Sequence, residues 1–192
     1  MSLSQLKREI LESMYMHGKA MDPAEIAVDT KMEVKRVNLN VLGLIRIGYA
    51  SSPEKGKYTI TKKGKNALGV PDTDRQKAVT ILSYASDDKP FVFYVEIGKP
   101  LDTQALSLRD FADKLGNVDV ASIEFHVNRK DFETWANGLG DSELAKRIEL
   151  LRLRSLVGED LRRQLFEIVE QRFVELTALA GQTGPPQQPT PA

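Results

Sequence analysis

The fold of the first part of the chain depends on residues 33–64, which read EVKRVNLNVLGLIRIGYASSPEKGKYTITKKG. Apolar residues recur at three- and four-residue spacing from Val34 to Ile45, which predicts a helix over residues 33–47. Residues 49–52 and 57–61 then predict two strands around a Pro-Glu-Lys-Gly tip, where Gly56 supplies the positive φ that tight tips often require. The stretch is therefore expected to form a helix followed by a hairpin.

Two shorter helices are expected before residue 33. Leu3, Leu6, Ile10 and Met14 lie on one helical face, and Gly18 can end that helix. Asp22-Pro23-Ala24-Glu25 has the capping-box pattern of a second helix start. Three short helices and a two-stranded hairpin come in the order of a winged helix-turn-helix.

The same residues resemble the winged-helix domains of bacterial and archaeal transcription regulators. The resemblance covers about residues 1–70. It rests on Val37, Val41, Leu44, the Gly48-Tyr49 turn and the segment Lys57-Tyr58-Thr59-Ile60-Thr61-Lys62-Lys63-Gly64-Lys65-Asn66-Ala67-Leu68. It implies a DNA-binding domain whose third helix enters the major groove. Gly43 departs from good helix composition, since glycine costs about 1 kcal/mol in a helix interior.

The remainder is expected to form a second domain after an interruption at 69–74. We expect a linker and connecting helix at 71–89, an acidic α+β domain at 90–180 and a disordered Pro/Gln-rich tail at 181–192. The expected elements are a helix at 75–85, a turn at 86–90, strands at 91–97 and 122–127, and helices at 107–115, 131–136, 141–153 and 159–179. The predicted fold class is α+β and predominantly helical.

This second part also resembles an archaeal domain family of unknown function, over about residues 90–178. The resemblance rests on the segments Phe91-Val92-Phe93-Tyr94, Ala105-Leu106-Ser107-Leu108-Arg109-Asp110-Phe111, Ser122-Ile123-Glu124-Phe125-His126, Arg129-Lys130-Asp131-Phe132-Glu133-Thr134-Trp135 and Leu139-Gly140-Asp141. It implies an archaeal source and supplies no activity.

Charge is divided unequally along the 192 residues although the formal net charge is zero. Residues 1–70 contain 12 Lys and Arg against 7 Asp and Glu, so they carry +5, and the rest carries −5. The first part is therefore the one expected to bind a polyanion. The chain has no cysteine, which excludes disulfides and thiolate chemistry. We expect no membrane span and no secretory signal, and hence a cytoplasmic, nucleoid-associated location.

Basic side chains and one amide form the candidate DNA-binding set, and they come from three predicted elements. They are Lys35, Arg36 and Asn40 on the third helix, Lys55 and Lys57 at the hairpin tip, and Lys62, Lys63 and Lys65 at the next helix start. Cations displace counterions from phosphates, whereas arginine and asparagine can read guanine and adenine edges. The alternative is that these lysines solubilise a domain that binds protein.

A second candidate site surrounds His126, one of two histidines in the chain. Glu124 and His126 are expected on one strand face, followed by Arg129, Asp131 and Trp135. This set predicts a possible ligand pocket or an acid–base centre, or else a histidine and arginine that satisfy nearby carboxylates above a core tryptophan. We expect no enzyme activity, no metal and no cofactor.

The functional hypothesis is a DNA-binding transcriptional regulator. Its partners would be double-stranded DNA and a second copy of the chain, with a protein or small-molecule effector at the second domain. The final helix could close that domain or contribute to a dimer. The alternatives are a nucleoid-organising protein and an adaptor whose winged helix binds an acidic partner.

Overall fold

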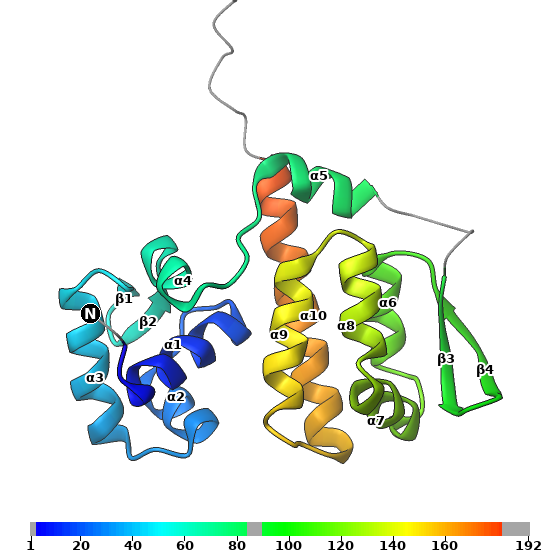
Figure 1. The fold of residues 1–192 in the computed structure, drawn as a ribbon, viewed down its shortest axis with the longest axis horizontal. Coiled ribbons are helices and arrows are strands. Elements are labelled where there is room, and N and C mark those ends of the chain that lie inside the picture. Colours follow the sequence, from blue (N-terminus) through cyan, green and yellow to red (C-terminus); the bar gives the residue numbers. More distant parts are fainter. Residues whose placement is uncertain (1–2, 84–89, 182–192) are drawn as a thin grey trace, which may run out of the picture.

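The computed structural model describes residues 3–83 and 90–181. Over those residues it has ten helices and two separate antiparallel sheets of two strands each, which confirms the predominantly helical α+β class. The chain forms two parts that lie side by side (Figure 1). The expected turn at 86–90 and the expected disordered tail fall almost wholly outside the described residues, although Gly181 still ends a helix.

The first part contains three helices, a hairpin and a fourth helix. The elements are α1 (Gln5–His17), α2 (Pro23–Thr30), α3 (Val34–Arg46), β1 (Ala50–Glu54), β2 (Lys57–Ile60) and α4 (Lys62–Leu68). The capping box predicted at the start of α2 is present: Asp22 accepts from the Ala24 and Glu25 amides, and Glu25 accepts from the Asp22 amide. Buried residues from α1, α2 and α3, among them Ile10, Val37 and Leu44, form its core.

The hairpin has the expected position and is attached through Tyr58 to the segment between the first two helices. Ala50 pairs with Ile60 and Ser51 with Thr59, and Gly56 at the tip has φ 79°. Tyr58 also pairs with Met21, through reciprocal backbone hydrogen bonds of 2.8 and 2.9 Å. These bonds fix the hairpin against the segment between α1 and α2.

The second part is mostly helical and is built around its last helix. Its elements are α5 (Arg75–Ser83), β3 (Phe91–Glu96), β4 (Lys99–Ala105), α6 (Leu108–Leu115), α7 (Val120–Arg129), α8 (Asp131–Gly138), α9 (Ser142–Arg152) and α10 (Gly158–Gly181). Helix α10 packs against α5, α6, α7 and α9, and also against α1 of the first part. An aromatic cluster that includes Phe91, Phe93, Phe111 and Phe132 fills the space between β3 and the helices.

The strand expected at 122–127 is wrong, because these residues lie within helix α7. The alternation of Ile123, Phe125 and Val127 suits a strand, but Ile123 and Val127 are also four residues apart and both are buried on one helical face. Asp119 caps the helix by accepting from the Ala121 amide. Glu124 and His126 therefore do not share a strand face.

The partner of β3 is instead β4, which the sequence analysis did not predict. Strand β4 reads KPLDTQA, a polar stretch with a proline, and most of its residues are exposed. Gly98, with φ 80°, makes the turn that brings it back along β3. The expectation of two strands in the second part thus holds, with the second strand in a different place.

No helix within the described residues is long and apolar enough to cross a membrane.

Candidate nucleic-acid interface

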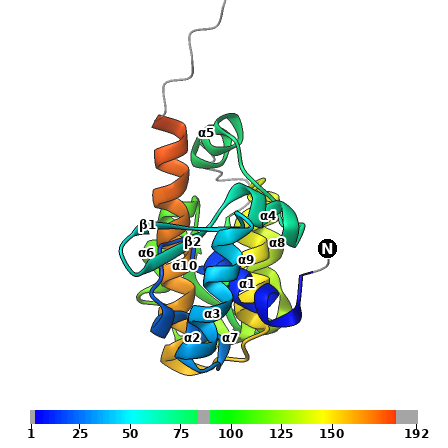
Figure 2. The same cartoon turned by 90° about the vertical axis from the view of Figure 1, so that its left-hand side faces the viewer.

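The outer face of α3 is solvent-exposed and points away from the second part of the chain. Figure 2 shows α3 facing the viewer, with the hairpin on one side, α4 on the other and the C-terminal helices behind. Lys35, Arg36 and Arg46 are exposed on this helix. Asn40 is half-buried, and its Nδ2 donates to the Arg36 carbonyl over 2.9 Å. The third helix is therefore accessible from outside, with two of its three predicted contact residues fully exposed.

Two leucines lie among these cations. Leu39 is 66% exposed and Leu42 is 55% exposed, so the outer face of α3 is both basic and apolar. Leu39 follows Lys35 by four residues, and Leu42 precedes Arg46 by four, which places leucines and cations along one stripe. An apolar contact surface at this position suits either the methyl groups of thymine or a protein partner.

Lys7 of α1 belongs to the same face and was missed by the sequence analysis. A Cβ placed on Gly43 would lie 3.4 Å from Lys7 Nζ and 3.5 Å from its Cε. The absence of a side chain at Gly43 therefore lets Lys7 lie against α3. The signal available in the sequence was the glycine itself, because a helix interior with a glycine invites close approach by another group.

The predicted hairpin and α4 lysines differ in their surroundings. Lys55 at the tip is exposed, and Lys57 lies 3.6 Å from Glu54 on the same hairpin. Lys62 is highly exposed and lies 3.6 Å from Asp72, whereas Lys63 donates to the Ile47 carbonyl over 2.9 Å. Lys63 therefore ties α4 to the end of α3 while its side chain remains at the surface.

Lys65, the last predicted contact, points into the boundary between the two parts of the chain. Its side chain is 20% exposed, and its Nζ donates to Glu143 over 2.9 Å and to Asp72 over 3.2 Å. It also lies 5.9 Å from the centre of the Tyr15 ring. Lys65 is thus part of an internal ion network, although it shares Asp72 with the exposed Lys62.

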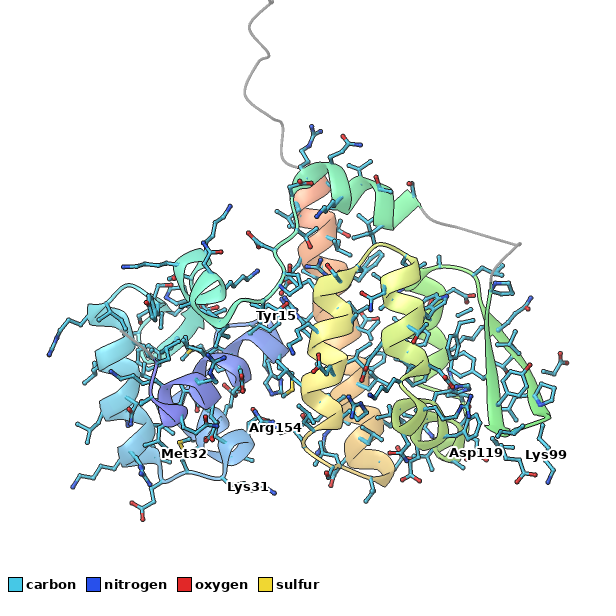
Figure 3. The ribbon with its side chains drawn as sticks, viewed as in Figure 1. Tyr15, Lys31, Met32, Lys99, Asp119 and Arg154 are labelled. Atoms are coloured by element: carbon cyan, nitrogen blue, oxygen red, sulfur yellow. The ribbon has the colours of Figure 1, made fainter. Side chains whose placement is uncertain are left out.

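This boundary network joins α4 to α9 and α10. Glu143 pairs with Arg147 over 2.9 Å and with Arg172 over 3.3 Å, and Arg172 also binds Asp141 over 2.8 Å. Burial alone would raise the pKa of Glu143, but Arg172, Arg147 and Lys65 together lower that pKa to about 2. Figure 3 shows Tyr15 at the same boundary, where burial raises the pKa of its hydroxyl.

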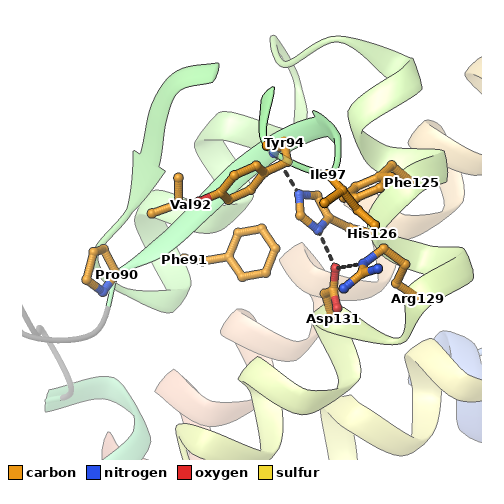
Figure 4. A pocket seen from close by; sticks show the side chains of 10 residues that line it. Pro90, Phe91, Val92, Tyr94, Ile97, Phe125, His126, Arg129 and Asp131 are labelled. Atoms are coloured by element: carbon orange, nitrogen blue, oxygen red, sulfur yellow. Dashed lines mark hydrogen bonds and ion pairs between the residues drawn. The ribbon is translucent and has the colours of Figure 1, made fainter. Parts of the chain in front are cut away.

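The second candidate site is a cavity of about 340 Å³ between the β3–β4 hairpin and α7 (Figure 4). Its walls include Phe91, Tyr94 and Phe125, with His126, Arg129 and Asp131 at one end. Glu124 and Trp135 do not line it. Glu124 accepts from the Gly158 amide over 2.7 Å, and Trp135 packs against the core, 4.7 Å from the Phe111 ring.

Both ring nitrogens of His126 are engaged inside the protein. The Tyr94 amide donates to Nε2 over 2.8 Å, and Nδ1 lies 2.8 Å from Asp131 Oδ2. Because Nε2 accepts, Nδ1 carries the proton and donates to Asp131. Burial lowers the pKa of His126, although Asp131 acts in the opposite direction. This neutral imidazole connects β3 to the junction of α7 and α8 and leaves neither nitrogen available to a substrate.

Neither at the His126 cavity nor elsewhere do the described residues contain a group of three or more His, Asp or Glu side chains able to hold a metal ion.

Comparison with protein families gives one match, to a family of unknown function (DUF5752), over residues 73–170. The match covers just over half of the chain. The chain belongs to the DUF5752 family. Searches of curated proteins and of solved structures found no match. The predicted resemblance of the second part to a domain family of unknown function is thereby confirmed.

The DUF5752 match divides the candidate sites between two segments of the chain. It begins at Thr73, so the basic face of α3 and the hairpin lie outside it. The His126 cavity lies wholly within it, as do Asp141, Glu143 and Arg147 of the boundary network. The DUF5752 segment therefore contributes Asp141, Glu143 and Arg147 to the boundary network, and the segment before it contributes Tyr15 and Lys65.

Proposed function

We propose that this DUF5752 protein is a DNA-binding transcriptional regulator whose residues 1–70 form a winged-helix domain. In this proposal α3 enters the major groove, and the β1–β2 hairpin contacts the neighbouring phosphates. The observation that carries it is the exposed basic face of α3, formed by Lys35, Arg36 and Arg46 with Lys7 beside them, on the side of the molecule away from α9 and α10 (Figure 2). An unobstructed helix with cations on its outer face has the shape and charge that a major groove accepts.

The side chains of α3 and the neighbouring Lys7 are suited to different contacts with DNA. Lys35, Arg46 and Lys7 are placed to neutralise phosphates, whereas Arg36 carries the paired donors that read guanine. One hydrogen of the Asn40 amide nitrogen donates to the Arg36 carbonyl, so the other hydrogen and the side-chain oxygen would contact a base edge. Leu39 supplies the apolar contact that favours a thymine methyl group.

The proposal extends to a homodimer that works in the cytoplasm, on the nucleoid, of an archaeal cell. Two copies of α3 would then occupy successive major-groove turns about 34 Å apart. The archaeal source rests on the resemblance of residues 90–178 described above.

Fluorescence anisotropy of a labelled DNA duplex, measured with the full chain across a series of salt concentrations, tests this proposal. Three to five neutralised phosphates give a slope of about −2.7 to −4.5 for log affinity against log salt. Lys35→Glu should weaken binding to every duplex alike, and Lys77→Glu is the matched control, because Lys77 is an exposed lysine on α5. Arg36→Ala should instead reduce the preference between duplexes, by about 1–3 kcal/mol at one position.

The exposure of Leu39 and Leu42 favours a second candidate, a protein-interaction adaptor that binds an acidic partner through α3. The same titration distinguishes the two functions. A chain that does not bind DNA would contradict the first function and favour the adaptor. The same conclusion follows if the affinity for DNA changes neither with salt nor in Lys35→Glu.

A further inference from the structure

The cavity between the β3–β4 hairpin and α7 is bordered by irregular strand pairing and by an exposed apolar side chain. The pairing of β3 with β4 shifts register between Val92 and Tyr94 and again between Tyr94 and Glu96. Tyr94 lies between these two register shifts. Its side chain lines the cavity, while its backbone amide donates to His126 (Figure 4). Ile97, at the mouth of the cavity, is 80% exposed. Ile97 thus adds exposed apolar surface to a concave site whose walls are largely apolar, as those of small-molecule sites are.

The apolar walls are largely aromatic. Phe91 reaches the cavity from the core, and Phe125 lies on α7 with the Arg129 guanidinium 5.1 Å from its ring centre. Flat rings on several sides favour a flat ligand, since aromatic pairs gain stabilisation from stacked or edge-to-face contact beyond that from burial. The volume of about 340 Å³ is at the lower end of the range for small-molecule sites, which limits a ligand to one or two rings.

The charges at the Arg129–Asp131 end of the cavity cancel. Arg129 Nε donates to Asp131 Oδ2 over 3.1 Å, and the same oxygen accepts from His126 Nδ1. The imidazole is neutral, so among the described residues that line this end the one cation and the one anion are already paired. An anionic ligand would face the carboxylate of Asp131, and a cationic ligand would face Arg129, so either would lose solvation without gaining a free counter-charge.

We propose that this cavity binds an uncharged aromatic molecule of one or two rings, stacked against Phe125 and Phe91, with its polar edge at the Arg129–Asp131 pair. Phe125 forms the outer wall, Ile97 covers the mouth, and the Arg129 and Asp131 side chains offer one donor and one acceptor to the polar edge. The site is independent of the DNA-binding surface, and it gives the DUF5752 segment a ligand of defined chemical class.

Protein-observed ¹H–¹⁵N NMR titration of the full chain with indole tests this inference, with indole-3-carboxylate as the anionic probe. Indole should shift the amide signals of Tyr94, Gly98 and Arg129 saturably, and the carboxylate should bind at least about tenfold more weakly because it loses about 1.4 kcal/mol or more to unfavourable desolvation. Indole that produces no saturable shifts at these amides overturns the proposal, as does tighter binding of the carboxylate.

Two variants separate the cavity from general apolar binding. Phe125→Ala should weaken indole binding about tenfold, whereas Phe166→Ala, which removes a partly exposed phenylalanine of α10, should leave it unchanged. Ile97→Ala tests the mouth without threatening the fold, since Ile97 is mostly in solvent, and should weaken binding several-fold. Equal affinity in the wild type and in Ile97→Ala and Phe125→Ala would contradict the assigned position.

Discussion

Glu143 is the residue on which the boundary between the two parts depends most. Its carboxylate is 1% exposed and accepts from Lys65, Thr73 and Arg147, and Arg172 lies 3.3 Å away. Together with Asp141 and Glu175 it compensates the charges of two arginines that are almost wholly buried, Arg147 and Arg172. Burying charged groups costs free energy, and removing one member of such a network leaves a buried charge without part of its compensation.

Glu143→Gln should therefore lower the free energy of unfolding by about 3–5 kcal/mol at neutral pH. Urea denaturation of the full chain measures this change. Glu149→Gln on the same helix is the matched control, because the Glu149 side chain is 38% exposed and pairs only with Lys146 among the described residues, and should cost about 0.5 kcal/mol or less. Equal effects of the two substitutions would show that the network does not stabilise the fold.

The same group predicts a pH dependence whose sign follows from its lowered pKa. In the unfolded chain Glu143 titrates near 4.5, and in the folded protein its pKa is about 2. The unfolded state therefore binds the proton first, so the contribution of Glu143 is complete above pH 4.5 and is lost as the pH falls towards 2. The loss amounts to about 3 kcal/mol, and denaturation at a series of acidic pH values should show it in the wild type and not in Glu143→Gln.

At the scale of elements, the helices with clear caps were predictable from the sequence. Ser107 and Asp141 cap α6 and α9 by accepting from amides three residues later, as capping residues do. Helix α7 was not predicted although Asp119 caps it, since its six residues of alternating pattern fit either a strand or one face of a helix. Strand β4 was missed because its polar residues owe their conformation to pairing with β3 rather than to their own propensity.

The candidate interface was predictable to a similar extent. Exposure of Lys35 and Arg36 follows from the helical period, which places them opposite the buried Val37, Val41 and Leu44. The position of Lys65 does not follow from it, because Glu143 lies 78 residues away in sequence and only the tertiary structure brings it close. For the same reason the sequence could not show that His126 uses both nitrogens internally.

Two glycines within helices have opposite roles, and their alanine variants should differ in sign. A Cβ at Gly64 of α4 would lie 2.2 Å from the Tyr49 carbonyl oxygen, so Gly64→Ala should destabilise the protein by about 2 kcal/mol or more. A Cβ at Gly43 of α3 would meet only the flexible end of Lys7, so Gly43→Ala should stabilise the protein by up to about 1 kcal/mol. Urea denaturation of both variants measures the difference.

Gly43→Ala also reports on the interface. If α3 lies in a major groove with Gly43 close to the duplex, the variant should bind DNA more weakly although its fold is more stable. A stabilised variant with unchanged DNA affinity would place the contact elsewhere on α3, nearer its first turn. Destabilisation by Gly43→Ala would show that the Lys7 side chain, which a Cβ at Gly43 would meet at 3.4 Å, does not move aside.

At the scale of the whole molecule, the two parts are joined by apolar and ionic contacts as well as by the linker. Tyr15 and Met16 of α1 belong to the larger core of the second part rather than to the core of their own part. Arg154, beyond α9, donates to Asp29 of α2 over 3.2 Å, and both residues lie at the boundary, where Figure 3 labels Arg154. Apolar contact and ion pairing at the same boundary should make the two parts unfold together.

This coupling is testable because Trp135 is the single tryptophan of the chain and lies in the second part. Its fluorescence follows the second part alone, whereas far-ultraviolet circular dichroism follows all helices. In the wild type the two signals should give the same urea midpoint, as a two-state transition requires. Different midpoints in the wild type would show that the boundary does not couple the two parts.

Tyr15→Ala should separate those signals. The Tyr15 ring is fully buried, lies 5.4 Å from the Arg147 guanidinium, and donates its hydroxyl proton to the Pro71 carbonyl over 3.4 Å. Removing it opens a cavity at the boundary and costs about 3–5 kcal/mol. Because the first part has the smaller core, it should unfold first, so that circular dichroism falls before Trp135 fluorescence changes. Tyr58→Ala, in the hairpin and away from the boundary, should lower stability without separating the two signals, since it weakens the first part while its junction with the second remains intact.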